Sequence, residues 1–329
     1  MRLCTFEVPT LLGRQTRLGA VAASGILDLH SVCAWHLARK GEAQPYRLAD
    51  VLVPPDMLKF LQGGVTSRTF AETAAADFLS IPPGPDLPIG GRGELLCFRQ
   101  EQVRLLPPLP HPPSIRDFYA FEEHVKKGFE KRGEPMPKEW YEMPVYYKSA
   151  HWSVIGPEDE VTWPSFTEKF DYELELAVII GKEGRNIPES EARGYIFGFT
   201  VMNDFSARDL QRKEMKVRLG PAKGKDFATA FGPVIVTADE IGDPYNLRMT
   251  ASVNGERWSE GNSGKIYHSF EKMISFASLD ETLSPGDILG SGTVGTGCGL
   301  ELDRWVKPND VIELTIEKIG TLRNKVIRR

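Results

Sequence analysis

The chain has 329 residues, with 40 Lys or Arg and 45 Asp or Glu, so its formal net charge is only −5 at pH 7. A chain of this length can bury a large core and is expected to form two lobes. Because acids and bases are interspersed, the composition gives no reason to expect nucleic acid or an anionic membrane as a partner.

The chain offers no membrane-spanning candidate and no cysteine framework. No stretch approaches the roughly 18 consecutive apolar residues of a spanning helix, and residues 1–15 lack the apolar core of a signal peptide. A cytosolic protein is therefore predicted. The four cysteines, at positions 4, 33, 97 and 298, show no Cys-x-x-Cys spacing, so we expect reduced thiols rather than a zinc site or disulfides.

The first part of the chain mixes short strand-like and helix-like segments. Strands are expected at 2–8, 18–23 and 25–29, and helices at 30–41 and 66–80. The chain then enters PPLPHPP, with five prolines in seven residues, which fits neither a helix interior nor a central strand. This extended connector predicts a smaller α+β domain at 1–106 and a second domain at 107–329.

The second domain is expected to be strand-rich. Apolar runs such as ELAVII, FGFTVMND, PVIVTA and VIELTIEK recur between glycine, proline and Asn-Asp punctuation. Asn254-Gly255 in SVNGERW fits the two-residue turn of a β-hairpin. Helices are expected after Phe118, after Phe205 and over 268–279. The fold class predicted for this domain is α+β, mostly β.

Two glutamates stand in FDYELELAVIIG, residues 170–181, where the chain becomes almost wholly apolar. In a strand, Glu173 and Glu175 point to the same side, with Cα atoms roughly 6.5 Å apart, and their charges repel. A hard divalent cation held between them would remove the conflict. The alternative is a solvated strand face, with the neighbouring apolar residues pointing inward.

Two further acids stand at element boundaries. Asp117 follows the proline-rich segment, and Asp204 closes the apolar run FGFTVMND. Each could instead be a helix N-cap, a position that favours Asp. Together with the glutamate pair they provide four hard oxygen donors without clustered Cys or His, which favours Mg²⁺, Mn²⁺ or Ca²⁺ over zinc.

Several motifs occur in one order over residues 107–329. They are Asp117 with His124 seven residues on, Glu173-x-Glu175, MNDFSARDLQ around Asp204, GKDF with Lys225, GSGTVG around Thr293, and NDVIELTIEKIGTLRNKV. Together they resemble the fumarylacetoacetate hydrolase family. The resemblance implies a mixed β-roll catalytic domain, a divalent metal, usually a homodimer, and chemistry on β-diketo or 2-oxo acids.

The resemblance also implies roles for individual residues. The family's metal ligands fall on Asp117, Glu173, Glu175 and Asp204, with Mg²⁺ as the first choice of ion and Mn²⁺ or Ca²⁺ as alternatives. Its catalytic pair falls on His124 and Glu301, where the carboxylate orients the imidazole that activates water. The expected substrate contacts are Tyr119, Tyr147, Arg208, Gln211, Lys225 and Thr293, and Lys225 also counts among the catalytic residues.

Elementary chemistry suits these roles. An imidazole can accept a proton near neutral pH, and a carboxylate can fix its tautomer. Arg208 is suited to two-pronged capture of a substrate carboxylate. Seven-residue spacing would place Asp117 and His124 on one helical face. On its own, however, His124 is also compatible with an exposed helix position, and His151 is a reserve candidate for the base.

The charged segment HVKKGFEKRGEPMPKEWYEMP, residues 124–144, has two interpretations. Its polarity and its Gly and Pro residues are typical of a solvated loop. In the family that the sequence resembles, the corresponding segment acts as a lid. GSGTVGTGCG lacks the lysine and Ser/Thr ending of a phosphate-binding loop, so nucleotide binding is not expected.

The predicted function is a metal-dependent hydrolase that cleaves a carbon–carbon bond in a fumarylacetoacetate- or acylpyruvate-like substrate, within aromatic catabolism such as tyrosine degradation. The alternative within the family is a hydratase, isomerase or decarboxylase of a 2-oxo acid. A water-activating pair favours hydrolysis between these two. A third hypothesis is a non-catalytic, metal-stabilised scaffold, which explains the carboxylates but not the histidine and cations that accompany them.

Overall fold

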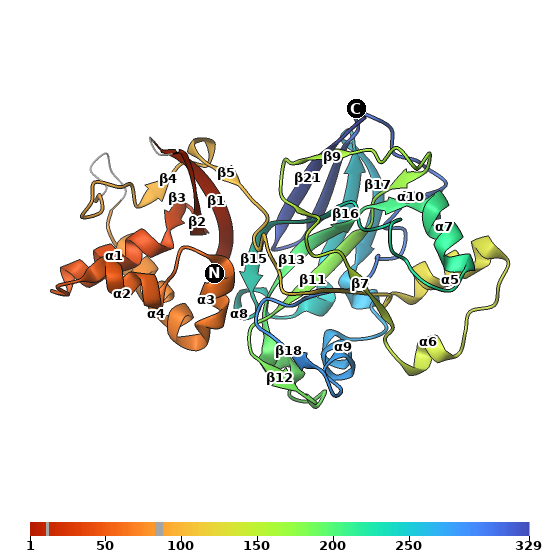
Figure 1. The fold of residues 1–329 in the computed structure, drawn as a ribbon, viewed down its shortest axis with the longest axis horizontal. Helices are drawn as coiled ribbons and strands as arrows, with labels where there is room; N and C mark the ends of the chain where they lie inside the picture. The colour runs from red at the N-terminus through yellow and green to blue at the C-terminus, as the bar shows by residue number, and fades with distance from the viewer. Residues whose placement is uncertain (11–12, 83–87, 329) are drawn as a thin grey trace. The chain divides into compact units, whose positions relative to one another are not determined.

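The computed structural model describes residues 1–10, 13–82 and 88–328. The chain divides into two compact units, Met1–Leu109 and Pro110–Arg329, and the division falls inside the proline-rich segment (Figure 1). The mixed α+β fold class expected from the sequence is confirmed. None of the helices in the described ranges is both long and apolar enough to span a membrane.

The first unit is a small antiparallel sheet with helices. Its strands, in spatial order, are β4 (Cys97–Phe98), β3 (Gly25–Asp28), β2 (Gly13–Ala22), β1 (Arg2–Thr10) and β5 (Arg104–Leu105). The helices are α1 (Leu29–Arg39), α2 (Pro45–Leu52), α3 (Met57–Gln62) and α4 (Gly64–Leu79), with a 3₁₀ turn η1 (Gln100–Gln102). Asp28 caps α1 by accepting a hydrogen bond from the backbone nitrogen of Ser31. The strands and helices expected here from hydrophobic pattern are confirmed.

The main sheet of the second unit positions the candidate site. Its strands, in spatial order, are β15 (Thr229–Thr237), β13 (Ile196–Asp204), β11 (Leu174–Ile180), β19 (Ile288–Gly290), β6 (Ile115–Phe118) and β7 (Tyr146–Ser149), and β8 (Val154–Ile155) also pairs with β15. The sheet is mixed, because β19–β6 and β15–β8 pair parallel and the other pairs are antiparallel. Every residue of β11 is buried, as expected for a central strand.

A second sheet of this unit packs against the main sheet through one apolar face. Its order is β17 (Glu256–Asn262), β16 (Arg248–Val253), β20 (Val311–Ile316), β21 (Gly320–Ile327) and β9 (Glu160–Thr162). Alternate residues of β16 and β20 are buried, which is the period of two that their sequences predict. Asn254 and Gly255 form the predicted two-residue turn between β16 and β17, both with positive φ, of 53° and 78°.

Short elements complete the second unit. They are the strand pairs β10 (Phe170–Asp171) with β14 (Ser206–Ala207) and β12 (Gly184–Arg185) with β18 (Thr282–Leu283), the helices α5 (Glu122–Arg132), α6 (Glu139–Glu142), α7 (Arg208–Lys216), α8 (Ala238–Ile241), α9 (Phe270–Ala277) and α10 (Gly299–Leu302), and the 3₁₀ turns η2 (Ala192–Tyr195), η3 (Pro244–Asn246) and η4 (Ser263–Lys265). The helices predicted after Phe118, after Phe205 and over 268–279 are therefore confirmed as α5, α7 and α9.

The loop interpretation of the charged segment 124–144 is wrong for its first half. Residues 122–132 form α5, with glutamates in its first turn and Lys131 and Arg132 in its last. This distribution complements the helix dipole, and Gly133 ends the helix with a left-handed φ of 70°. The high charge of the segment thus belongs to the solvated face of a helix. A solvated loop and a polar helix have similar compositions, so the sequence pattern hardly distinguishes them.

Candidate active site and metal centre

Four carboxylates converge on one side of the main sheet. Asp117 lies in β6, Glu173 directly precedes β11, Glu175 lies within β11, and Asp204 ends β13. Each offers an oxygen within 4.8 Å of the others. Glu173 and Glu175 are 4% and 0% exposed, so the alternative of a solvated strand face is wrong.

The strand order explains the convergence. β11 pairs with β13 on one side and with β19 on the other, and β19 in turn pairs with β6. Glu175 lies opposite Met202 in the β11–β13 register, and Asp117 lies opposite Gly290 in the β19–β6 register. Asp117 and Asp204 are therefore strand residues, and the alternative that they cap helices is wrong.

Glycines make room for these carboxylates. A Cβ at Gly290 would lie 2.7 Å from Asp117 Oδ1 and 3.0 Å from Glu175 Oε2. Gly292 has a φ of 75°, and its backbone N–H donates to Glu175 Oε2 over 3.1 Å. The GSGTVG motif thus serves the carboxylates through its small residues and its backbone.

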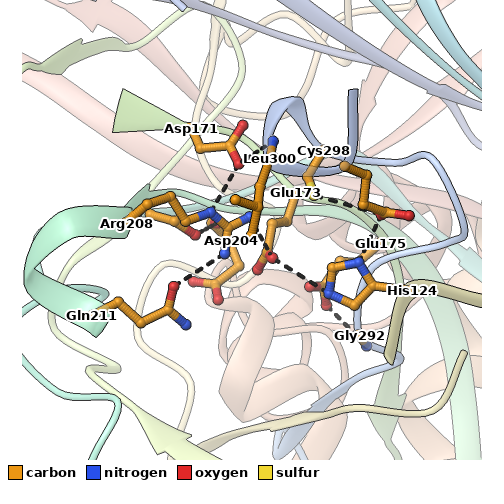
Figure 2. A network of polar contacts seen from close by, with 12 residues as sticks. His124, Asp171, Glu173, Glu175, Asp204, Arg208, Gln211, Gly292, Cys298 and Leu300 are labelled. Carbon is orange, nitrogen blue, oxygen red and sulfur yellow. Dashed lines mark hydrogen bonds and ion pairs between the residues drawn. The ribbon is translucent and has the colours of Figure 1, made fainter. Parts of the chain in front are cut away.

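Two buried cations face the carboxylates. Lys225 Nζ donates to both Glu173 Oε2 and Asp204 Oδ2, and Arg208 Nη2 donates to Glu173 Oε1 over 2.8 Å. Burial alone would raise the pKa of Glu173, but Arg208 and Lys225 hold it well below its usual range. Glu173 is therefore ionised and already neutralised by side chains, as the network in Figure 2 shows for its contact with Arg208.

The other carboxylates are less well compensated. Burial and the charge of Asp204 raise the pKa of Asp117 well above its usual value. Burial, followed by the charges of Asp117 and Glu173, does the same to the pKa of Glu175. Both groups therefore hold protons strongly when no other cation is near them.

The carboxylate oxygens that have no hydrogen-bond partner fit a divalent cation. Asp117 Oδ1, Glu175 Oε1 and Asp204 Oδ1 are buried and have no hydrogen-bond partner in the described structure. Unpaired buried oxygens are costly and rare, so three on neighbouring residues indicate an absent ligand. An all-oxygen donor set is the one that Mg²⁺, Mn²⁺ and Ca²⁺ prefer, and the residues present therefore fit such an ion.

His124 and Glu301 form a hydrogen-bonded pair beside this centre. Their Nδ1 and Oε1 atoms lie 2.7 Å apart, and Nε2 lies 3.9 Å from Glu173 Oε1. Because an ionised carboxylate only accepts, Nδ1 carries a proton toward Glu301, and in the neutral imidazole the lone pair is then on Nε2. Burial would raise the pKa of Glu301, but the hydrogen bond from His124 lowers it, so the carboxylate stays ionised. His124 is buried, and its exposed-helix alternative is wrong.

Asp117 and His124 do not share a helical face, as their spacing suggested. Asp117 is in strand β6 and His124 is in helix α5, which begins only at Glu122. The chain turns between them, so the two residues meet through tertiary structure rather than through helical periodicity. His151, the reserve base, is exposed and pairs through Nδ1 with the backbone oxygen of Pro112, so it takes no part in this network.

Two members of the network, Asp171 and Cys298, were not among the site residues predicted from the sequence. Asp171 is fully buried and binds Arg208 Nε over 2.8 Å and the backbone nitrogens of Gly299 and Leu300. Its position, two residues before Glu173, was a usable signal, because residues 171, 173 and 175 share one parity. Cys298 is buried and donates to Glu301 Oε1 over 3.5 Å, and no sequence pattern marked it.

The expected substrate contacts have different surroundings. Tyr147 donates to Asp204 Oδ2 over 2.6 Å, and the ring of Tyr119 lies edge-on to His124 with 5.3 Å between centroids. Gln211 accepts from Arg208 Nη1 over 3.1 Å. Thr293 is buried in the segment after Gly292. All four lie on segments that contribute to the network.

Arg208 has several internal partners, and its expected contact with a substrate carboxylate stays a prediction. Its three nitrogens already donate to Asp171, Glu173 and Gln211, so the guanidinium does not present two free nitrogens to a substrate carboxylate. An arginine side chain has five N–H donors, so one remains on each Nη. In this structure Arg208 is first an internal counter-ion of the carboxylates.

Known proteins resemble this chain over most of its length. A model of the fumarylacetoacetate (FAA) hydrolase C-terminal family matches residues 114–327. The human mitochondrial oxaloacetate tautomerase FAHD2A is 30% identical over 329 residues, which cover 99% of this chain and 92% of that protein. The rat oxaloacetate tautomerase Fahd2a, also named mitochondrial, is 30% identical over 331 residues with the same coverage.

Solved structures share the fold over the full chain. The fumarylacetoacetate hydrolase of psychrophilic Exiguobacterium antarcticum has a TM-score of 0.69 at 25% identity, covering 99% of this chain and 100% of that chain. The maleylpyruvate hydrolase of Sphingobium sp. SYK-6, solved with manganese(II) and pyruvate, has a TM-score of 0.69 at 24% identity, covering 100% and 99%.

Replacing one oxygen donor tests the metal centre. Glu175→Gln keeps the shape of the side chain but removes its charge, so we expect the protein to fold and to lose most of its affinity for Mn²⁺ and Mg²⁺. For the wild type, metal at 100 times its dissociation constant should add about 2.7 kcal/mol of stability. Thermal unfolding with and without metal measures this gain. Glu183→Gln on the exposed surface is the matched control, and an equal metal response in both variants would contradict the assignment.

Proton linkage gives a second test of the same centre. The raised pKa values of Asp117 and Glu175 mean that the metal-free native state binds more protons than the unfolded state at mildly acidic to neutral pH. Its stability should therefore fall as pH rises through this window, while metal binding should release protons and stabilise more at about pH 8 than at about pH 5.5. Calorimetry in buffers of different ionisation enthalpy measures the released protons. Metal binding without proton release would show that both carboxyls are already ionised.

Proposed function

Because the chain belongs to the fumarylacetoacetate hydrolase family, we propose that it is a divalent-metal-dependent enzyme that interconverts the keto and enol forms of a 2-oxo acid. The observation that carries the proposal is the His124–Glu301 pair, whose free imidazole nitrogen faces the carboxylate centre. Relatives that align with nearly the whole chain are named oxaloacetate tautomerases, and this favours oxaloacetate or a close analogue as the substrate.

The proposed metal ligands are Asp117, Glu173, Glu175 and Asp204. Mg²⁺ is our first choice, with Mn²⁺ or Ca²⁺ as alternatives, because all four ligands are carboxylates. When bound there, such an ion would act as a Lewis acid toward the oxygens of a 2-oxo acid. Lys225, held between Glu173 and Asp204, adds a fixed positive charge on the same side.

The proposed base is His124. Its Nε2 takes a proton from the carbon next to the keto group, and the electron pair of the C–H bond moves toward the keto oxygen. The imidazolium then returns the proton to that oxygen, so the enol forms with no gain or loss of atoms. Glu301 stabilises the imidazolium and fixes the ring, because its carboxylate accepts the Nδ1 proton. Thr296 N–H and Cys298 Sγ hold the carboxylate in turn.

Hydrolysis of a carbon–carbon bond is the second candidate. The 3.9 Å between His124 Nε2 and Glu173 Oε1 is too long for a direct hydrogen bond, so the lone pair is open to a water as well as to a substrate proton. His124 would then take a proton from that water as it attacks a carbonyl carbon. The bond to the neighbouring carbon would break, its electron pair would leave with the departing fragment as an enolate, and the imidazolium would return the proton to that enolate. The function predicted from sequence is this one, and the same acid–base pair supports it.

Two further expectations stay predictions. The resemblance implies a homodimer, and composition implies a cytosolic protein, whereas several relatives are named mitochondrial. The scaffold hypothesis is not retained, because it provides no reason for a histidine–glutamate pair beside the carboxylates.

Substrate assays decide between the two reactions. The purified protein with Mg²⁺ or Mn²⁺ should accelerate the keto–enol interconversion of oxaloacetate, followed by the ultraviolet absorbance of the enol, and Glu175→Gln should not. A parallel assay follows pyruvate released from an acylpyruvate, which the tautomerase proposal expects to stay at the buffer rate. Pyruvate release without acceleration of the oxaloacetate reaction would replace the proposal with hydrolysis.

Variants of the acid–base pair test its role on whichever substrate is active. His124→Ala should keep the metal-dependent gain in thermal stability and lose about 10²- to 10⁴-fold in kcat, which is the usual contribution of general acid–base catalysis. Glu301→Gln should also be slow, because the imidazole loses its negative partner. His151→Ala is the matched control and should keep wild-type turnover. Near-wild-type kcat in His124→Ala would remove this residue from the mechanism.

A further inference from the structure

A cavity of about 250 Å³ lies against α7, outside the carboxylate centre. Its lining comes from α7, from Lys169 and from the segment that contains α10 and Trp305. The lining residues are Lys169, Arg208, Asp209, Arg212, Lys213, Lys216, Leu300 and Trp305. Those on α7 recur with a spacing of four, so they share one face of the helix, and Gln211 lies on another face.

The charge of this cavity is one-sided. Five of its lining residues are cations and only Asp209 is an acid. The Asp209 carboxylate is already engaged, because it accepts hydrogen bonds from Thr167 Oγ1 and from the backbone nitrogens of Glu168 and Leu210. Among the residues that the structure describes, Lys169, Arg212, Lys213 and Lys216 form no ion pair. Four cationic side chains thus converge around the cavity, and the single negative charge of Asp209 offsets only part of theirs.

Arg208, Arg212 and Lys216 recur at a spacing of four on α7, so their like charges repel, whereas Asp209 and Lys213 form a favourable pair at the same spacing. A bound anion would relieve the repulsion. The wall opposite α7 is apolar, since Leu300 and the indole of Trp305 line it, and Lys169 Nζ lies 5.1 Å from the centroid of that indole. A pocket that combines an apolar wall with several convergent charges is the usual form of a small-molecule site.

Arg208 joins this cavity to the carboxylate centre. The residue is 7% exposed and lines the cavity, while its Nε and Nη2 donate to Asp171 and Glu173 on the inner side (Figure 2). None of the proposed metal ligands lines the cavity, and Arg208 is the lining residue that also binds one of them, Glu173. An occupant would lie on the outer side of the Arg208–Asp171 pair.

We propose that this cavity is a second anion-binding site, which takes a small molecule with at least two negative charges, such as a di- or tricarboxylate or a phosphate compound. A volume of about 250 Å³ holds roughly eight waters at 30 Å³ each, which suits a compact anion. Lys169, Arg212, Lys213 and Lys216 supply the charge, and hydrogen bonds from charged donors to anionic oxygens are the strong ones.

Calorimetric titration of the metal-free protein tests the site, with citrate and inorganic pyrophosphate as probes at constant ionic strength. At least one probe should bind saturably to the wild type at one site per chain. Lys213→Gln with Lys216→Gln should weaken that binding about tenfold or more, since two charged contacts are lost. The matched control is Lys265→Gln with Lys325→Gln, which removes the same charge from exposed lysines elsewhere in the unit and should change affinity less than about twofold.

The two probes also identify the chemistry. Preference for pyrophosphate assigns the site to a phosphate compound, preference for citrate assigns it to a carboxylate, and similar binding of both assigns it to multivalent anions in general. Absence of saturable binding to the wild type would overturn the proposal. Equal weakening in the two double variants would overturn it too, because attraction by overall charge would then explain the binding.

Discussion

The burial of negative charge is the constraint on which the second unit depends. Asp117, Asp171, Glu173, Glu175 and Asp204 are each at most 4% exposed. Moving a carboxylate out of water costs several kcal/mol unless cations and hydrogen bonds replace the solvent. Arg208 and Lys225 provide the replacement for some oxygens and leave others unpaired. The surrounding fold must therefore be stable enough to hold this charge in place, and the wholly buried strand β11 provides that support.

The chemistry of the site follows from this uneven compensation. Glu173 receives both cations, and its pKa is lowered despite burial, whereas the pKa values of Asp117 and Glu175 are raised by burial and by their acidic neighbours. One side of the cluster is thus a fixed ion-pair network, and the other side is the place where a further cation would gain most. His124 lies beside Glu173, on the compensated side, so its imidazole can act on a substrate without competing for the unpaired oxygens.

Local sequence signals predicted elements that depend on local chemistry, and they failed where distant segments meet. The Asn254-Gly255 hairpin, the alternating strands β16 and β20, and helices α7 and α9 were predictable because turn chemistry and periodicity specify them. Glu173 and Glu175 were predictable as a pair because a strand has a period of two. Asp117 was predicted to share a helical face with His124. It lies instead in the four-residue strand β6, which is too short to show a recognisable strand pattern in the sequence. The attachment of Arg208 to Asp171 depends on the β10–β14 pairing, which brings Phe170 opposite Ala207, and no spacing within the sequence predicts that pairing.

Helix α7 combines two electrostatic environments that the sequence alone presents as one charged segment. Its first residue, Arg208, is buried and bound to acidic and amide partners, whereas Arg212, Lys213 and Lys216 are exposed around a cavity without such partners. The chain as a whole carries a net charge of −5, so this local excess of positive charge is a property of one face and not of the composition. Convergent cations beside an apolar wall raise the local concentration of small anions by field focusing. Since the proposed substrates are anionic 2-oxo acids, the same face that would hold a second anion also favours their approach to the unit that carries the carboxylate centre.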